Sequence, residues 1–295
     1  MSERPYFSVV TPSFNQGAWI DGCIQSVLAQ QTDNFEHLVF DNCSTDETLA
    51  VLAKYPHVRT VSEPDRGQAH ALNKAFAAAK GEVICWLNAD DRYPPGTFDI
   101  VRRELSKPGV DFIYGDSEEV FFDGRSGGRR KPRYDTPDDI LFWWEKRFEL
   151  MQPAVFFRRY LLDKTGPLRE DLFIIMDAEF YWRAAAHVQF HYVPEVLAIQ
   201  QRLPESKTVR FAHRLYEEKK KVLGALLDEK YPDRKVRHAF RRRSRMGWRW
   251  LSLARLMAPH DPAQARACLR ESVSENPLMW ISPSWWRTRL ALRHA

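Results

Sequence analysis

Short apolar runs alternate with helix-forming stretches over the first hundred residues, and this alternation constrains the fold more than any other feature of the chain. The runs at 7–10, 37–40, 58–61 and 83–87 are typical of strands, and amphipathic or alanine-rich stretches separate them. Strands that alternate with helices predict an α/β fold with a mostly parallel sheet covered on both faces. In such sheets, ligands bind at the carboxyl ends of the strands.

Polar segments follow the predicted strands at the points where the strands end, at 11–15, 41–46, 65–66 and 88–91. If the sheet is parallel, all four segments meet at one edge and form a site. The last segment carries two adjacent carboxylates, Asp90 and Asp91. Adjacent carboxylates suit Mg²⁺ or Mn²⁺, which bind through one or two carboxylates together with phosphate oxygens. A helix cap followed by a polar turn is the alternative interpretation.

Other residues at this edge carry more than one interpretation. Asp41 could accept a hydrogen bond from the imide N–H of uracil or thymine, or from a guanine edge. Ser44 and Asp46 are typical of turns and helix caps. Arg66 could face a phosphate, or pair with Asp65 on a solvated loop.

The pattern changes after residue 110. Strands are predicted at 112–114, 118–122, 155–157 and 190–193, and a helix is predicted at 177–186. The glycine- and arginine-rich stretch 124–131 predicts a mobile loop or a hairpin tip.

Charge divides the chain in two. Residues 211–295 carry 19 Lys and Arg against 8 Asp and Glu, a net +11, which leaves −6 for residues 1–210 because the whole chain carries +5. Within the basic part, 234–257 mixes arginine with tryptophan and leucine. This stretch predicts either contact with an anionic membrane surface or a helical appendage that packs on the preceding domain with its arginines solvated. No nucleic-acid motif accompanies it, so no nucleic-acid partner is expected.

The chain has no run of about 18 apolar residues and no signal-peptide pattern at its start, so neither a membrane span nor secretion is expected. Its 4 cysteines show no metal-binding spacing, which favours reduced thiols in the cytoplasm.

Three segments together resemble the nucleotide-binding half of family 2 glycosyltransferases, which have the GT-A fold. They read SVVTPSFNQGAWIDGCIQSVLAQ, HLVFDNCSTDET and SEPDRGQAHALNKAFAAAKGEVICWLNADDRYPPG. The resemblance covers residues 6–100 closely and extends more loosely to about 205. It implies a nucleotide-sugar donor, inversion at the anomeric carbon, and a domain at 1–210 made of a nucleotide-binding half (1–100) and an acceptor-side half (101–210). Residues 211–295 are then a basic helical extension.

The resemblance implies roles on the donor side for residues of this chain, according to their positions in the matching motifs. The first-strand motif that lines the nucleotide pocket falls on Thr11, Pro12 and Phe14, with Asn15 beside it, and the base-contacting acidic residue falls on Asp41. The family's DxD motif falls on Asn88, Ala89 and Asp90, with Asp91 directly after it. An aspartate is common where this chain has Asn88, so the metal-binding role rests on Asp90 and Asp91. Arg66, Arg202 and Lys207 are the residues expected to reach the phosphates.

On the acceptor side, the resemblance implies that Asp177 is the base that deprotonates the acceptor hydroxyl. Glu179 lies about 200° away on the same helix, which makes it a supporting or surface residue. Gln152 is expected to border the acceptor pocket, and Trp143 or Trp144 could stack on a sugar.

The processive members' QxxRW motif is missing, which favours addition of a single sugar. The resulting prediction is a metal-dependent transferase at the cytoplasmic face of the membrane. It would act on a glycan or lipid-linked glycan in bacterial surface polysaccharide or lipopolysaccharide synthesis. The alternatives are a sugar-nucleotide-binding protein without transfer activity and a basic interaction module on a scaffold domain.

Overall fold

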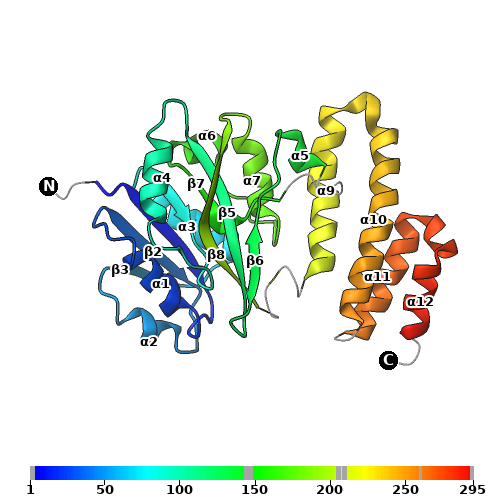
Figure 1. Cartoon of the computed structure of the whole chain (residues 1–295), viewed down its shortest axis with the longest axis horizontal. Helices are drawn as coiled ribbons and strands as arrows, with labels where there is room; N and C mark the ends of the chain where they lie inside the picture. The colour runs from blue at the N-terminus through cyan, green and yellow to red at the C-terminus, as the bar shows by residue number, and fades with distance from the viewer. Residues whose placement is uncertain (1–3, 143–148, 204–206, 208–210, 259–260, 293–295) are drawn as a thin grey trace. The chain divides into compact units, whose positions relative to one another are not determined.

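A computed structural model describes residues 4–142, 149–203, 207, 211–258 and 261–292. The chain forms two compact units: residues 1–140 with 148–210, and residues 141–147 with 211–295. The first unit contains the whole sheet, and the second is helical (Figure 1).

The first unit is built on one mixed sheet of eight strands in the order β3-β2-β1-β4-β7-β5-β6, with β8 paired to β5. The strands are β1 (Phe7–Ser13), β2 (Phe35–Asp41), β3 (Val58–Ser62), β4 (Val83–Trp86), β5 (Phe112–Phe121), β6 (Ser126–Arg130), β7 (Val155–Arg158) and β8 (Phe190–Arg202). Helices cover the sheet, which confirms the predicted α/β, GT-A-like architecture with additional C-terminal helices (Figure 1).

The parallel direction of the first four strands decides where the site lies. β1 pairs in parallel with both β2 and β4, and β2 pairs in parallel with β3. All four strands therefore end at the same edge of the sheet, as the alternation predicted. β7 runs antiparallel to β4 and to β5, which makes the sheet mixed.

Helices lie between the first four strands, as the alternation predicted, and the helix at 176–184 lies within two residues of the predicted 177–186. In α1 the apolar residues Ile20, Cys23, Ile24 and Val27 are buried against the sheet, whereas Leu28 at its end is exposed. The helical segments are α1 (Ile20–Leu28), α2 (Thr48–Leu52), α3 (Gln68–Ala78), α4 (Thr97–Leu105), α5 (Asp138–Leu141), the short 3-10 helix η2 (Gln152–Ala154), α6 (Tyr160–Thr165) and α7 (Met176–Ala184).

Two strand boundaries differ from the sequence prediction because pairing between strands continues beyond the residues that have a strand-like sequence pattern. The two strands expected at 112–122 form one strand, β5, since β8 pairs along its length through a register shift near Asp116. The glycine- and arginine-rich stretch agrees with the predicted hairpin rather than with the predicted loop, because it contains the end of the turn and the second strand of a β-hairpin. It forms β6, which pairs antiparallel with β5.

The second unit contains α9 (Ala212–Lys230), η3 (Pro232–Arg234), α10 (Lys235–Met257), α11 (Pro262–Glu275), η4 (Pro277–Ile281) and α12 (Pro283–Ala291). Gly247 lets α10 approach α11 and η4 closely, because a Cβ there would lie 2.5 Å from the Asn276 Cβ. No described helix is long and apolar enough to cross a membrane.

The stretch 234–257, one of whose predicted roles was membrane contact, lies in α10. Most of its described apolar side chains are in the core of the second unit: Met246, Trp250, Leu251 and Leu253 are buried. Trp248 is exposed. These four described side chains are therefore covered within the second unit and are not available for membrane contact while the unit stays folded.

Candidate active site

Asp41 ends β2 and organises the loops around it. Its carboxylate accepts hydrogen bonds from the Ser44 N–H at 2.9 Å, the Ser44 hydroxyl at 2.5 Å and the Ser62 hydroxyl at 2.9 Å. Asp41 is buried. Ser44 is therefore fastened to Asp41 rather than capping a helix. A nucleobase could reach this carboxylate only through the lone pair of Oδ1 that remains unused.

The end of β1 places its side chains in different directions. Thr11 is fully buried, and its hydroxyl hydrogen-bonds the Nε2 atom of His37 at 3.0 Å. Its side chain cannot line a nucleotide pocket, which corrects that part of the prediction. Phe14, by contrast, is 55% exposed, and Pro12 is half-buried. Burial lowers the pKa of His37 to about 3, so the histidine is neutral beneath the site.

Asn15 holds the β1 loop against the β2 loop. Its N–H donates to the Ser44 hydroxyl at 2.7 Å, and its Oδ1 accepts from the Thr45 N–H at 2.9 Å. The backbone of Asn15 is left-handed, with φ of 53°. Asn is among the few non-glycine residues that adopt this conformation readily, so Asn15 shapes the rim of the edge through both its backbone and its side chain.

The segment after β4 brings Asp91 into the interior. Asp91 is only 2% exposed. Its Oδ1 accepts from the Gln201 N–H at 3.2 Å, and its Oδ2 accepts from the Asn88 side-chain amide at 3.3 Å. The Asn88 carbonyl accepts from Trp86 Nε1 and Gln68 Nε2, each at 3.1 Å. Asn88 therefore orients Asp91, and its own oxygen is turned toward other donors.

The two adjacent carboxylates repel each other, and Asp91 is buried while Asp90 is half-buried. Burial raises the pKa of the Asp90 carboxyl, and burial together with the charge of Asp90 raises the pKa of Asp91 well above its usual range. Two adjacent carboxylates that disfavour ionisation are suited to a bound cation, which offsets both penalties. No cluster of three or more His, Cys, Asp or Glu that could hold a metal occurs among the described residues. Mg²⁺ or Mn²⁺ would therefore need phosphate and water oxygens as well, in keeping with their usual coordination.

A chain of polar contacts links this pair to the acceptor-side half of the unit. The Gln152 oxygen accepts from Asn88 Nδ2 at 2.9 Å, and its amide donates to the Trp86 carbonyl at 2.6 Å. Lys207 donates to Gln68 Oε1 at 2.9 Å, and its ammonium lies 4.4 Å from the centre of the Phe173 ring. Gln152 and Lys207 therefore lie at the same edge as Asn88, although they come from distant parts of the sequence.

Arg202 is held beside the carboxylate pair. It ion-pairs with Glu119, which is buried and also pairs with Arg130. The charge of Arg202 acts to lower the pKa of Asp91. The buried Glu119 carboxylate therefore binds the partly exposed guanidinium groups of Arg202 and Arg130. Together these three side chains carry a net positive charge near the edge.

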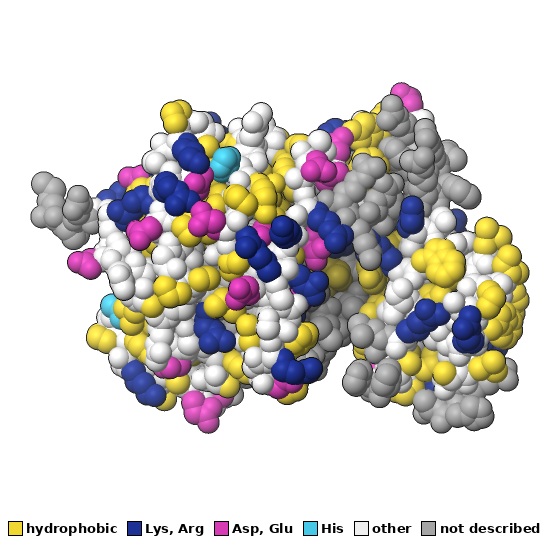
Figure 2. All heavy atoms as spheres, viewed as in Figure 1, with side chains coloured by type: hydrophobic (Ala, Val, Ile, Leu, Met, Phe, Trp, Pro, Cys, Tyr) yellow, Lys and Arg dark blue, Asp and Glu magenta, His cyan; other side chains and the backbone are white. Residues whose placement is uncertain are grey.

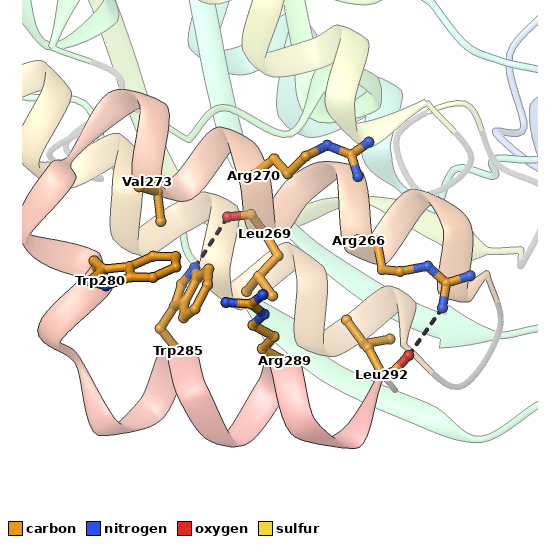
Figure 3. Close-up of a pocket in the computed structure, with 8 residues that line it drawn as sticks. All are labelled: Arg266, Leu269, Arg270, Val273, Trp280, Trp285, Arg289 and Leu292. Atoms are coloured by element: carbon orange, nitrogen blue, oxygen red, sulfur yellow. Dashed lines mark hydrogen bonds between the residues drawn. The ribbon is translucent and has the colours of Figure 1, made fainter. Parts of the chain in front are cut away.

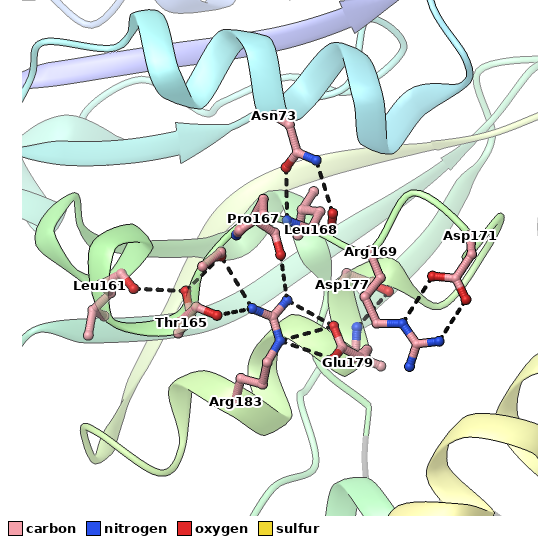
Figure 4. A network of polar contacts seen from close by, with 12 residues as sticks. Asn73, Leu161, Thr165, Pro167, Leu168, Arg169, Asp171, Asp177, Glu179 and Arg183 are labelled. Atoms are coloured by element: carbon pink, nitrogen blue, oxygen red, sulfur yellow. Dashed lines mark hydrogen bonds and ion pairs between the residues drawn. The ribbon is translucent and has the colours of Figure 1, made fainter.

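The segment before α7 is fastened by a network of polar contacts (Figure 4). Glu179 is buried, not a surface residue, and it pairs with Arg183, which also donates to the carbonyls of Thr165, Gly166 and Pro167. Asp177 is half-buried in the first turn of α7, where its Oδ1 accepts from the Ala178 N–H at 2.8 Å. Glu179 therefore supports the helix, and Asp177 is the member of the pair with accessible surface.

Two contacts join this segment to the nucleotide-binding half. The Asn73 side chain on α3 makes a pair of hydrogen bonds with the backbone of Leu168, at 2.8 and 2.9 Å (Figure 4). The exposed Arg66 pairs with Glu170 at 2.6 Å rather than with Asp65. In the structure, Arg66 therefore braces the acceptor-side loop.

The predicted stacking residues Trp143 and Trp144 lie outside the described residues. Several residues at the edge had no signal in the sequence: Gln68, Ser62, Glu119, Arg130 and Gln201. Gln201 acts through its backbone, which no side-chain pattern can reveal.

A parallel α/β edge with adjacent carboxylates and nearby cations is typical of one class of protein, those that bind a nucleotide-linked substrate. The family described as Glycosyl transferase family 2 matches residues 8–166. The chain belongs to this family of glycosyltransferases.

Similar proteins agree with this assignment. An uncharacterized glycosyltransferase of Mycobacterium tuberculosis is 30% identical over 255 residues, which cover 82% of this chain and 92% of the relative. The succinoglycan biosynthesis protein ExoO of Rhizobium meliloti is 29% identical and is matched over 59% of this chain and 56% of its own length.

Solved structures show the same fold. S. aureus TarS 1-349 in complex with UDP-GlcNAc has a TM-score of 0.59 at 18% identity, covering 91% of this chain and 88% of that one. Mannosyltransferase PcManGT from Pyrobaculum calidifontis, in complex with GDP-Man and Mn²⁺, has a TM-score of 0.53 at 20% identity, covering 99% and 86%.

Proposed function

We propose that this chain is an inverting, metal-dependent glycosyltransferase that moves one sugar from a nucleotide-sugar donor to a glycan or a lipid-linked glycan. The observation that carries the proposal is the carboxylate pair of half-buried Asp90 and buried Asp91 at the shared carboxyl edge of four parallel strands. The pair disfavours its own ionisation, and a cation carrying a diphosphate would relieve that cost.

The nucleoside would lie over the ends of β1 and β2. There the exposed Phe14 ring and the half-buried Pro12 offer an apolar surface, and Asp41 offers one remaining lone pair to a base N–H. Asp90 and Asp91 would hold the cation. Arg202 and Lys207 would neutralise the phosphates, since both already lie beside the carboxylate segment. The bound cation would supply charge neutralisation for the departing diphosphate.

The transfer itself needs one proton acceptor from the chain. The acceptor hydroxyl attacks the anomeric carbon on the face opposite the leaving group, and a new C–O bond forms as the bond to the nucleoside diphosphate breaks. The electron pair of that bond leaves with the diphosphate. Asp177 takes the proton of the attacking hydroxyl. Its half-buried position at the start of α7 suits a base that must meet the substrate.

The acceptor is proposed from chemistry and from relatives. ExoO is named for succinoglycan biosynthesis, which supports a bacterial polysaccharide as the product class. The lack of a QxxRW motif favours addition of a single sugar. Within bacterial surface polysaccharide or lipopolysaccharide synthesis, such an enzyme would work at the inner face of the cell membrane.

The test separates binding from chemistry. Binding and hydrolysis of a panel of nucleotide sugars would be measured with Mn²⁺, with Mg²⁺ and with EDTA, in the wild type and in Asp177→Asn. The variant should bind the donor normally and lose about 10²- to 10⁴-fold in turnover, the usual contribution of a general base. Asp163→Asn is the matched control because Asp163 is an exposed aspartate in the first turn of another helix, α6.

If Asp177→Asn retained full turnover, a different residue would be the base. If no donor bound under any condition, the transferase proposal itself would be wrong. Donor binding by a wild type that never transfers sugar to any oligosaccharide or extracted lipid acceptor would favour the binding-protein alternative.

A further inference from the structure

The second unit carries a groove between α11 and α12 that the proposed transfer reaction does not use (Figure 3). Its volume is about 510 Å³. The lining consists of three arginines, two tryptophans and three aliphatic residues: Arg266, Arg270, Arg289, Trp280, Trp285, Leu269, Val273 and Leu292. No carboxylate lines it. A groove with several cations and no acid is suited to an anionic ligand.

The arginines of the groove have no acidic partner among the described residues. Arg266 donates to the Leu292 carbonyl at 3.0 Å. The Arg289 guanidinium lies between three indole rings, 5.4 Å from the centres of Trp280 and Trp285 and 5.1 Å from that of Trp286. Stacking on aromatic faces fixes a guanidinium and leaves its in-plane N–H groups directed outward. The sequence around it adds charge of one sign, since 276–292 contains two arginines and no Asp or Glu.

Large apolar side chains on the segments that line this groove are exposed to solvent. Leu278 is 69% exposed and Ile281 is 75% exposed. Both lie on η4, where side chains three residues apart point the same way. Leu290 on α12 is also exposed. Figure 2 shows hydrophobic and Lys or Arg side chains adjacent to one another on the visible face of this unit.

We propose that η4, α12 and the groove arginines form a docking surface for an anionic phospholipid bilayer. Leu278 and Ile281 would enter the boundary between head groups and acyl chains, and Trp280 would lie at head-group level. Arg266, Arg270 and Arg289 would contact lipid phosphates. The combination of unpaired cations with protruding aliphatic groups matches the charge and polarity of this boundary.

This surface is distinct from the basic stretch 234–257. The described leucines of that stretch, Leu251 and Leu253, are buried, so they cannot enter a membrane while the unit stays folded. The exposed aliphatic residues of the second unit lie instead on η4 and α12. The proposal does not depend on donor binding, because none of its residues lies in the unit that contains the carboxylate pair.

The test is co-flotation of the full chain with vesicles of phosphatidylcholine alone and of phosphatidylcholine and phosphatidylglycerol in equal parts. The wild type should float only with the anionic vesicles and should release as salt is raised. Arg266→Gln with Arg270→Gln should weaken partitioning about 25-fold, since each surface cation contributes about fivefold. Leu278→Ser with Ile281→Ser should weaken it about tenfold or more.

Matched controls remove the same groups from the first unit. Lys54→Gln with Arg59→Gln removes two exposed charges, and Leu28→Ser with Leu49→Ser removes two exposed leucines. Both controls should float like the wild type, and all variants should keep wild-type donor affinity. Equal flotation with both vesicle types would overturn the proposal. So would weakening by the controls as large as by the groove variants, or binding of soluble glycerophosphoglycerol without any vesicle binding.

Discussion

Replacing Asp91 with asparagine should make the metal-free protein more stable and remove its response to divalent cations. Asp91 is buried beside a second carboxylate, Asp90, and both effects raise its pKa. A charge buried without a partner costs several kcal/mol. Asparagine has the same shape and carries no charge, so the variant avoids that cost.

The gain is reduced by a hydrogen-bond conflict. Asp91 accepts from two donors, the Gln201 N–H and the Asn88 amide. An asparagine amide would turn its own NH₂ toward one of them, which costs about 1–3 kcal/mol. The larger charge term prevails, and the net gain should be about 1–3 kcal/mol. For a domain of this size, such a gain raises Tm by roughly 3–10 °C.

Thermal unfolding in EDTA, and then with Mn²⁺ and a nucleoside diphosphate, would measure both effects. The wild type should gain about 2.7 kcal/mol at a ligand concentration 100 times Kd, and the variant should gain little. In EDTA the difference should shrink as pH falls toward about 3.9, the usual carboxyl pKa. The sign follows because, above about 3.9, the unfolded state loses the carboxyl proton while the folded state retains it, so the stability of the wild type falls as pH rises.

Asp33→Asn is the control, since Asp33 is exposed. A variant at position 91 that was less stable than the wild type in EDTA, yet shifted equally with Mn²⁺, would refute the reasoning. That result would mean that Asp91 is a structural acceptor in a turn.

Three further predictions follow from contacts around the edge. Asn73→Ala removes both hydrogen bonds to Leu168 and should raise acceptor KM with little change in donor affinity; equal loss of both would show that the loop serves the whole site. Stability should fall between pH 6.5 and about 3 by up to roughly 5 kcal/mol, because only the unfolded state protonates His37 over that range; His37→Gln should flatten this slope in denaturant titrations. Glu119→Gln should lower turnover because it removes the ion pair that holds Arg202, whereas Glu118→Gln, on the same strand, should leave turnover unchanged. An equal fall in donor affinity in both variants would contradict a positioning role for Glu119.

The sequence predicted the fold because its signals were local. Strand runs and helical spacing act over a few residues, and parallel strands with short crossovers leave few topologies. From these local signals, the ends of the first four strands were predicted to meet at one edge, and the adjacent carboxylates Asp90 and Asp91 were predicted to lie there. The family motifs then supplied roles for Asp41 and Asp177.

The sequence did not predict the directions in which side chains point or the partners that they contact. Thr11 is buried against His37, and no pattern in a sheet covered on both faces tells which side chains turn inward. Arg66 pairs with Glu170, 104 residues away, rather than with its neighbour Asp65. The site of Asp91 is completed by a backbone N–H from Gln201.

The chain alone thus determined the order of its elements, the edge that carries the site and the carboxylates that give the site its charge. Only the tertiary structure decided that Asn88 orients Asp91, that Glu179 supports α7, and that Leu251 and Leu253 of α10 belong to a core. Periodicity and motifs are properties of neighbouring residues, whereas hydrogen-bond partners and burial depend on segments that meet only when the chain has folded.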